Sequence, residues 1–188
     1  MNPPPTQPLP LFVDLDGTLI ATDVFNQSLL GVLKHRPWQI PALLITWLFR
    51  GRPELKRLAY RRARLDITRL PYRPAVLELI RSARDAGQPV ILATASHREP
   101  AQHVADHLGV FDDVLASEQR NNLKAGRKLD AIRDWCTQHN HTGFAYAGDA
   151  RPDLVIWQQA DHAIAVAPPP RVRAQITRRG INATILDA

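Results

Sequence analysis

The chain has 188 residues, 45% of them hydrophobic and 22% charged, which is typical of one soluble globular domain with room for a small inserted module. Its single cysteine, Cys136, excludes an internal disulfide and favours a reducing, cytoplasmic setting. The net charge of +6 favours anionic partners, such as nucleic acid, an acidic membrane surface or a phosphorylated substrate. The first ten residues contain five prolines and no apolar stretch, so we expect no secretory signal and predict a flexible arm over residues 1–9.

Short apolar runs that alternate with helical patterns indicate the fold class. The runs predict strands at 10–13, 89–93, 114–116, 144–148, 163–167 and 183–186. The helical patterns lie at 74–86, 99–108, 129–138 and 152–159, and a basic helix begins at 171. This alternation predicts a three-layer, Rossmann-like α/β fold with a parallel sheet. Ligands of such sheets bind at the carboxyl ends of the strands.

A long stretch after the first strand contains no strand pattern. Helical patterns lie at 24–33, 38–49 and 54–65, and Gly51-Arg52-Pro53 is predicted to turn the chain between the last two. We therefore predict a helical cap over residues 22–72. The cap is inserted into a core domain that consists of residues 1–21 and 73–188.

Two aspartates follow the first predicted strand directly, in the run Asp14-Leu-Asp16-Gly17-Thr18. Transfer of a phosphoryl group requires a nucleophile, neutralisation of the phosphate charge and a proton donor for the leaving group. We expect Asp14 to attack phosphorus and Asp16 to protonate the leaving oxygen and then to activate water. Gly17 allows the backbone to turn sharply after the strand.

Further acids near the C-terminal half complete a candidate metal site. Asp149 ends a predicted strand, and Asp153 lies in the first helical turn after Pro152. Mg²⁺ binds a few carboxylates together with phosphate and water. We therefore predict Mg²⁺ as the cofactor, with Asp14, Asp16, Asp149 and Asp153 as its ligands.

The phosphate group of the substrate also needs neutral and cationic donors. Thr94 ends a predicted strand, and its hydroxyl with the following amides, beginning at Ala95, are candidates to hold a phosphate oxygen. A lysine would neutralise charge between nucleophile and phosphate. Lys124 is the preferred candidate, and Lys128 is the alternative at a similar distance before the final acids.

These four motifs resemble those of the haloacid dehalogenase (HAD) superfamily. The resemblance rests on DLDGTL with Asp14 and Asp16, LATAS with Thr94, Lys124, and GDARPD with Asp149 and Asp153. It covers residues 9–167 and implies a C1-type helical cap and Mg²⁺-dependent hydrolysis of a phosphate monoester through an aspartyl-phosphate. Asp16 favours phosphate chemistry, because a dehalogenase would not need this second aspartate. Ala125, where the family often has glycine after its lysine, and Arg151-Pro152 depart from the family pattern.

Within the superfamily, the chain is similar to phosphoserine-phosphatase-like members and most resembles the HAD domain fused to UbiA-type membrane prenyltransferases. The runs LFVDLDGTLIATD, VILATASHRE and FAYAGDARPDLVIW carry this likeness. It implies a prenyltransferase as a candidate partner. A non-catalytic accessory domain of such an enzyme is the alternative function.

The middle of the predicted cap is strongly apolar. The segment 38–49 carries Trp38, Trp47 and Phe49 and is flanked by basic residues, but its 12 residues are fewer than the roughly 20 that span a bilayer. Aromatic residues flanked by cations suit an anionic membrane interface. Our hypothesis is that the cap rests on the membrane and admits a lipid-linked (prenyl sugar) phosphate. The alternatives are packing within the cap or in a dimer, and a soluble substrate such as phosphoserine or a sugar phosphate.

The positive charge is concentrated in one segment. From Arg50 to Arg73 there are nine Lys or Arg residues against Glu54 and Asp66, so the rest of the chain is close to neutral. The segment matches no nucleic-acid-binding motif, and we do not expect nucleic acid as a partner. His103 and His107 lie one helical turn apart without a third ligand, which favours a solvated helix face over a metal site.

Overall fold

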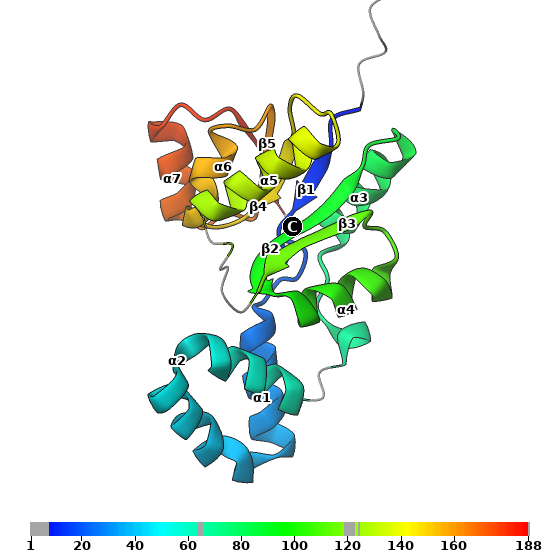
Figure 1. Ribbon diagram of the computed structural model, residues 1–188. Helices are drawn as coiled ribbons and strands as arrows, with labels where there is room; N and C mark the ends of the chain where they lie inside the picture. The colour runs from blue at the N-terminus through cyan, green and yellow to red at the C-terminus, as the bar shows by residue number, and fades with distance from the viewer. Residues whose placement is uncertain (1–7, 64–65, 119–122, 124, 188) are drawn as a thin grey trace, which may run out of the picture.

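A computed structural model describes residues 8–187 apart from 64–65, 119–122 and 124. Its centre is a parallel sheet with the order β3-β2-β1-β4-β5-β6 (Figure 1). The strands are β1 (Leu11–Val13), β2 (Val90–His97), β3 (Asp113–Ser117), β4 (Ala145–Gly148), β5 (His162–Val166) and β6 (Ala183–Leu186). The predicted α/β fold is confirmed. Strand order reverses beside β1, so the residue after β1 lies at the switch point where such sheets bind ligands.

Helices cover both faces of the sheet (Figure 1). One face is covered by α3 (Pro74–Asp85) and α4 (Arg98–Leu108), and the other by α5 (Gly126–Gln138), α6 (Leu154–Trp157) and α7 (Pro170–Arg178). The side chains of β1 alternate between the two faces of the sheet: Leu11 and Val13 pack with α3 and α4 on one face, and Phe12 packs with α5 on the other. Because β1 is buried on both faces, it holds the backbone of Asp14 rigidly at the carboxyl edge.

The cap lies beyond the carboxyl edge of the sheet (Figure 1). It contains α1 (Val24–His35), α2 (Ile40–Ala63) and the short 3-10 turns η1 (Pro37–Gln39) and η2 (Ile67–Arg69). All four elements fall within residues 22–72, the segment predicted as the cap. The Asp23 carboxylate caps α1 by accepting a hydrogen bond from the Phe25 amide at 2.7 Å.

Two local expectations were wrong. The predicted turn at Gly51-Arg52-Pro53 is absent, because α2 continues through it and curves instead (Figure 1). Pro53 has no amide hydrogen to donate, and a helix accommodates one such loss by bending. Thr94 does not end its strand, because β2 continues to His97 with a shift of register between Thr94 and His97.

Candidate active site

The carboxyl edge of the sheet brings three of the predicted acids together. Val13 pairs with Ala147, so Asp14 and Asp149 leave neighbouring strands side by side. Asp153 belongs to η3 (Arg151–Asp153), and its Oδ2 accepts hydrogen bonds from the amides of Asp149 at 3.2 Å and Ala150 at 3.0 Å. One carboxylate oxygen from each of the three acids lies within 4.8 Å of the others.

A buried lysine lies within this cluster. Lys128 is in the first turn of α5, its Nζ is 3.0 Å from Asp14 Oδ2 and 3.6 Å from Asp153 Oδ1, and its side chain is 4% exposed. Lys128 Nζ also donates to the Tyr146 hydroxyl at 2.9 Å, and that hydroxyl donates to Asp153 Oδ1 at 2.7 Å. Lys124, the preferred candidate in the sequence, lies outside the described residues. The structure therefore places the alternative lysine beside Asp14.

The charges of the cluster are strongly unbalanced. Three carboxylates face one ammonium, so the fully ionised group carries a net charge of −2. Burial raises the pKa of Asp14 to about 7, and it raises that of Asp149 to about 6, with a further increase from Asp153 in both cases. Burial alone would lower the pKa of Lys128, but Asp14 and Asp153 outweigh it and hold that pKa above its ordinary value.

These features fit a hard divalent cation. Its charge would match the net charge of the cluster, and carboxylate oxygens are the ligands that Mg²⁺ prefers. Asp14 accepts a hydrogen bond from the Leu15 amide at 2.8 Å and contacts Lys128, and Asp149 accepts one from Thr18, so both are less fully engaged than Asp153. Asp153 is 1% exposed and already accepts hydrogen bonds on both oxygens, which suits it to orient the site or to bind the ion weakly.

The carboxylate of Asp16 faces away from this cluster. Its Oδ1 accepts a hydrogen bond from the Val24 amide at 2.7 Å, and its Oδ2 accepts a short one from the Ser96 hydroxyl. Ser96 also lines a narrow cleft between cap and core, together with Phe25, Tyr60 and His97. The arrangement separates the two aspartates: Asp14 faces the metal-ligand cluster and Asp16 faces the cap.

The predicted phosphate-binding residues lie on β2, next to β1. Val13 pairs with Leu92, so Thr94 lies near Leu15, one residue beyond the position facing Asp14. Thr94 is buried and its hydroxyl accepts a hydrogen bond from the Ser96 amide at 2.9 Å. Ala95 is exposed and its carbonyl accepts a hydrogen bond from the Ser117 hydroxyl at 2.9 Å. Phosphate binding by Thr94 and Ala95 stays a prediction.

The loop after β1 packs directly against Asp149. Gly17 has φ of +82°, and a Cβ added there would lie 2.2 Å from Asp149 Oδ2. Thr18 donates a hydrogen bond to Asp149 Oδ1 at 3.2 Å, and Arg73 Nε donates one to the Gly17 carbonyl at 3.2 Å. Gly17 is thus required both for its backbone conformation and for the close approach of a predicted metal ligand.

Sequence reasoning missed two residues of the site. Ser96 lies just before α4, but His97 caps that helix by accepting from the Glu99 amide at 3.3 Å, while the Ser96 hydroxyl donates to Asp16. Tyr146 seemed an ordinary core residue of a strand. In the sequence, its one distinguishing feature is its position three residues before Asp149. That its hydroxyl contacts Lys128 becomes visible only in the folded structure.

The two histidines of α4 contact the cap rather than solvent alone. Tyr60 forms a hydrogen bond with His103 Nδ1 at 2.6 Å, and Tyr72 stacks on His107 with ring centroids 6.2 Å apart. Among the described residues, neither belongs to a group suited to a metal. They therefore help to join the core to the cap.

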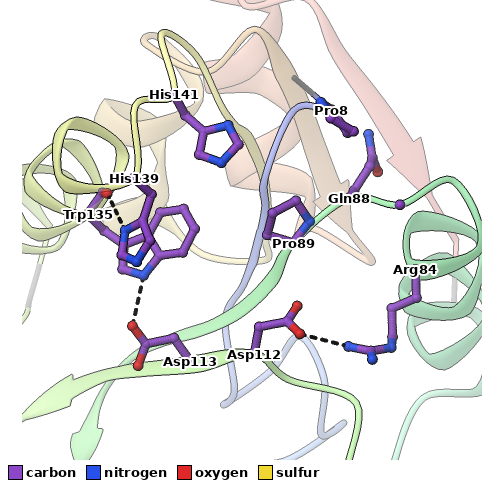
Figure 2. A pocket seen from close by; sticks show the side chains of 10 residues that line it. Pro8, Arg84, Gln88, Pro89, Asp112, Asp113, Trp135, His139 and His141 are labelled. Atoms are coloured by element: carbon purple, nitrogen blue, oxygen red, sulfur yellow. Dashed lines mark hydrogen bonds and ion pairs between the residues drawn. The ribbon is translucent and has the colours of Figure 1, made fainter. Parts of the chain in front are cut away.

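A second hollow lies at the opposite, amino edge of the sheet (Figure 2). Gln88 and Pro89 precede β2 there, and Asp112 precedes β3. Figure 2 shows two pairs among its polar groups: Trp135 Nε1 donates to Asp113 at 2.8 Å, and Arg84 contacts Asp112 at 3.3 Å. Of the predicted site residues that the structure describes, none lines this hollow.

A parallel sheet with helices on both faces and a cluster of acids at its carboxyl edge defines the chain as a three-layer α/β domain with a ligand-binding site at that edge. The family model for haloacid dehalogenase-like hydrolases matches residues 11–156. The chain belongs to this family, as its motifs predicted.

Individual relatives agree with the family assignment. An uncharacterized protein, y4nM of Sinorhizobium fredii (strain NBRC 101917 / NGR234), is 37% identical over 178 residues, which are 95% of this chain and 34% of that protein. The chain thus spans about a third of the length of this relative. A solved protein of unknown function from Bordetella pertussis Tohama I is 16% identical, with a TM-score of 0.72 over 97% of this chain and 99% of that one. A structure described as a phospho-aspartyl intermediate analogue of phosphoserine phosphatase is 13% identical. Its TM-score is 0.65 over 97% of this chain and 94% of that one.

Proposed function

We propose that the chain is a Mg²⁺-dependent phosphatase that hydrolyses a phosphate monoester through an aspartyl-phosphate on Asp14. The observation that carries the proposal is the contact of Lys128 with Asp14 inside a cluster of three carboxylates. The structural similarity to a phosphoserine phosphatase described as a phospho-aspartyl intermediate analogue supports the same chemistry.

In the proposed reaction, Lys128 assists the nucleophile Asp14, and Asp16 transfers protons on the side of the site that faces the cap. Lys128 favours the ionised form of Asp14, whose carboxylate oxygen forms a bond to phosphorus as the bond to the leaving oxygen breaks. Asp16, on the cap side, gives its proton to that leaving oxygen, which departs as an alcohol. The same carboxylate then takes a proton from the water that attacks phosphorus, and inorganic phosphate and free Asp14 result.

The metal would be held by Asp14 and Asp149, with Asp153 beside them. When bound, Mg²⁺ supplies positive charge to the phosphate oxygens. We propose Asp16 for proton transfer and not for a carboxylate bond to the metal, because its side chain is directed to Val24 and Ser96. Thr94 and Ala95 are proposed to hold the phosphate from β2.

The test is hydrolysis of an aryl phosphate by the purified chain. We expect turnover with Mg²⁺ and none with a chelator, and loss of turnover in Asp14→Asn. Acid quenching should trap a mass increase of one phosphoryl group in the wild type but not in Asp14→Asn. Asp134→Asn, on the exposed surface of α5, is the matched control and should keep full turnover. Equal turnover in Asp14→Asn would refute the proposal.

For the substrate, we propose a phosphate carried on a lipid, such as a prenyl-linked sugar phosphate, delivered at the inner face of the membrane. The support is the apolar surface of the cap, where all the large exposed hydrophobic side chains of the described chain lie. A small soluble ester such as phosphoserine or a sugar phosphate is the alternative. Parallel panels of lipid phosphates and soluble phosphates separate the two by their kcat/KM values.

A non-catalytic accessory domain of a membrane prenyltransferase is the second candidate function. The relative y4nM, of which this chain matches 34%, shows that a related domain occurs within a longer protein, as this candidate function requires. It predicts no metal-dependent turnover on either panel, whereas the phosphatase predicts turnover on at least one.

A further inference from the structure

The cap leaves many apolar side chains exposed to solvent. Every large exposed hydrophobic side chain in the described part of the molecule belongs to one segment, and we call these eight residues the apolar cap face: Leu29, Leu30, Leu33, Trp38, Leu44, Ile45, Leu48 and Phe49. The cap's own core contains four buried residues, namely Val32, Leu43, Ala59 and Ala63. Among the described residues, more large apolar side chains are therefore exposed on the cap than are buried within its core, and such a concentration of exposed apolar side chains is typical of an interaction site.

The apolar side chains follow the same spacing on both helices. On α1, Leu29, Leu30 and Leu33 are separated by one and three positions, and on α2 the same spacing recurs at 44, 45 and 48. At about 100° per residue, each triplet occupies an arc of roughly 100° on its helix. The helices α1 and α2 pack against each other, and η1, which carries Trp38, joins them at one end of the cap.

This end of the cap is the part remote from the sheet. Figure 1 shows α1 leading away from the core and α2 beginning at the far end. The most exposed residues are Phe49 at 79%, Leu48 at 73% and Trp38 at 71%. The core domain therefore does not cover the apolar cap face.

The charge around the face has one sign. Between Asp23 and Glu54 the sequence contains no acidic residue, whereas it contains Lys34, Arg36, Arg50 and Arg52. Lys34 is exposed next to Leu33, and Arg36 is partly buried beside η1. An apolar surface with exposed aromatic side chains, in a segment whose charged residues are all basic, is complementary to a bilayer surface of negative charge.

We propose that the apolar cap face docks on an anionic lipid membrane. In the described part of the chain no helix is long and apolar enough to cross a bilayer, so α1 and the first half of α2 lie in the interfacial plane. The apolar side chains enter the boundary between headgroups and acyl chains, and the basic residues meet lipid phosphates. The docking is independent of catalysis and does not rest on the proposed phosphatase activity.

Docking would also connect the membrane to the cap side of the candidate active site. The first amide of α1, that of Val24, binds Asp16 Oδ1, so the helix that carries Leu29, Leu30 and Leu33 starts at the proposed proton donor. This connection, unlike the docking itself, rests on the proposed function.

The experiment is flotation of the full chain with two kinds of vesicle, phosphatidylcholine alone and phosphatidylcholine mixed with phosphatidylserine. We expect binding to the mixed vesicles that weakens as salt is added, and little binding to the neutral ones. Leu48→Glu places a charge in the centre of the face and should weaken binding by about tenfold or more. Gln138→Glu, at the exposed end of α5, adds the same charge outside the face and should bind as the wild type does.

Three outcomes would overturn the docking proposal. The first is no flotation with mixed vesicles at low salt, and the second is equal flotation of Leu48→Glu and wild type while both melt at the same temperature. The third is a stable dimer in solution that Leu48→Glu dissociates without any vesicle binding, which would assign the face to a second copy of the chain. Asp14→Asn should float as the wild type does, so loss of phosphatase activity and loss of docking are observed separately.

Discussion

Lys128 Nζ lies 3.0 Å from Asp14 Oδ2, and both side chains are almost fully buried. A buried ammonium at this distance stabilises the ionised carboxylate, which is the form that would attack phosphorus in the proposed reaction. The same ammonium is 3.6 Å from Asp153 Oδ1, so one cation serves two of the three acids. Because α5 begins at Gly126, Lys128 lies in its first turn, and this position brings the ammonium to Asp14 and Asp153.

Replacing Lys128 by methionine should abolish most of the activity. The substitution keeps the length of the side chain but removes the buried ammonium from the cluster of three carboxylates, so Asp14 will hold its proton more tightly. We expect kcat on an aryl phosphate with Mg²⁺ to fall on the order of a hundredfold or more, as on loss of one charge-stabilising donor. Lys124→Met is the control and should retain kcat. The opposite result would identify Lys124 as the functional lysine.

The two lysines show what the sequence could and could not predict. Lys124 and Lys128 precede Asp149 at similar distances along the sequence. Spacing alone does not show that α5 begins at Gly126 and therefore carries Lys128 but not Lys124. Because α5 starts at Gly126, Lys128 falls in its first turn and reaches Asp14. Which of the two lysines contacts Asp14 could not be read from spacing, whereas the positions of Asp14 and Asp149 at the carboxyl edge could be predicted, because each directly follows a buried apolar strand.

The fold itself was largely predictable for the same reason. Apolar runs of strand length that alternate with helical periods determine a layered α/β sheet with few alternatives. Errors arose where a local signal competed with packing, as at Gly51-Arg52-Pro53, where the helix bends and continues. Tyr146 was missed because a tyrosine in a buried strand resembles any core aromatic until the partner of its hydroxyl is known.

Removing the Tyr146 hydroxyl should loosen the site without changing its charge. In Tyr146→Phe, Lys128 loses an acceptor and Asp153 a donor, both in a buried environment. We expect a loss of about 1–3 kcal/mol in the free energy of unfolding. We also expect a higher Mg²⁺ concentration for half-maximal activity, because Asp153 would be less well positioned.

The matched control for Tyr146→Phe is Tyr72→Phe. This change also removes a hydroxyl, one that donates to the Ile67 carbonyl at 3.0 Å, but it lies outside the carboxylate cluster. It should leave the Mg²⁺ dependence unchanged. Equal Mg²⁺ dependence in Tyr146→Phe and wild type, measured by activity and by the Mg²⁺-induced rise in Tm, would contradict a positioning role.

Alanine at Gly17 should damage the site through one defined contact. Gly17 and Gly87 have similar positive φ angles of +82° and +71°, so alanine introduces comparable backbone strain, of about 1 kcal/mol, at either position. A Cβ at Gly17 would lie 2.2 Å from Asp149 Oδ2, whereas a Cβ at Gly87 would meet nothing within 4 Å. Gly17→Ala should therefore lower Mg²⁺ affinity and kcat, and Gly87→Ala should lower Tm only. If the two variants had the same kcat, the contact with Asp149 would be unimportant for function.

The pKa values of Asp14 and Asp149 lead to a dependence of stability on pH and metal. Both are raised in the folded chain, to about 7 and about 6 from 3.8, chiefly by burial. Between about pH 4 and pH 7 the metal-free folded state therefore binds more protons than the unfolded state. Their contribution to stability is complete below the unfolded pKa and is lost as pH rises, so with a chelator present the free energy of unfolding should fall across this range.

Mg²⁺ should reverse this trend, because it competes with protons for the same oxygens. The rise in Tm on adding Mg²⁺ should be small near about pH 5, where both carboxylates are protonated, and larger above about pH 7, where both are ionised. Thermal melts at each pH with Mg²⁺ and with a chelator measure the difference. Asp149→Asn removes one of the two titrating ligands and should reduce the Mg²⁺-induced rise at the higher pH. A rise that is equal at both pH values would mean that the ion binds elsewhere than at Asp14 and Asp149.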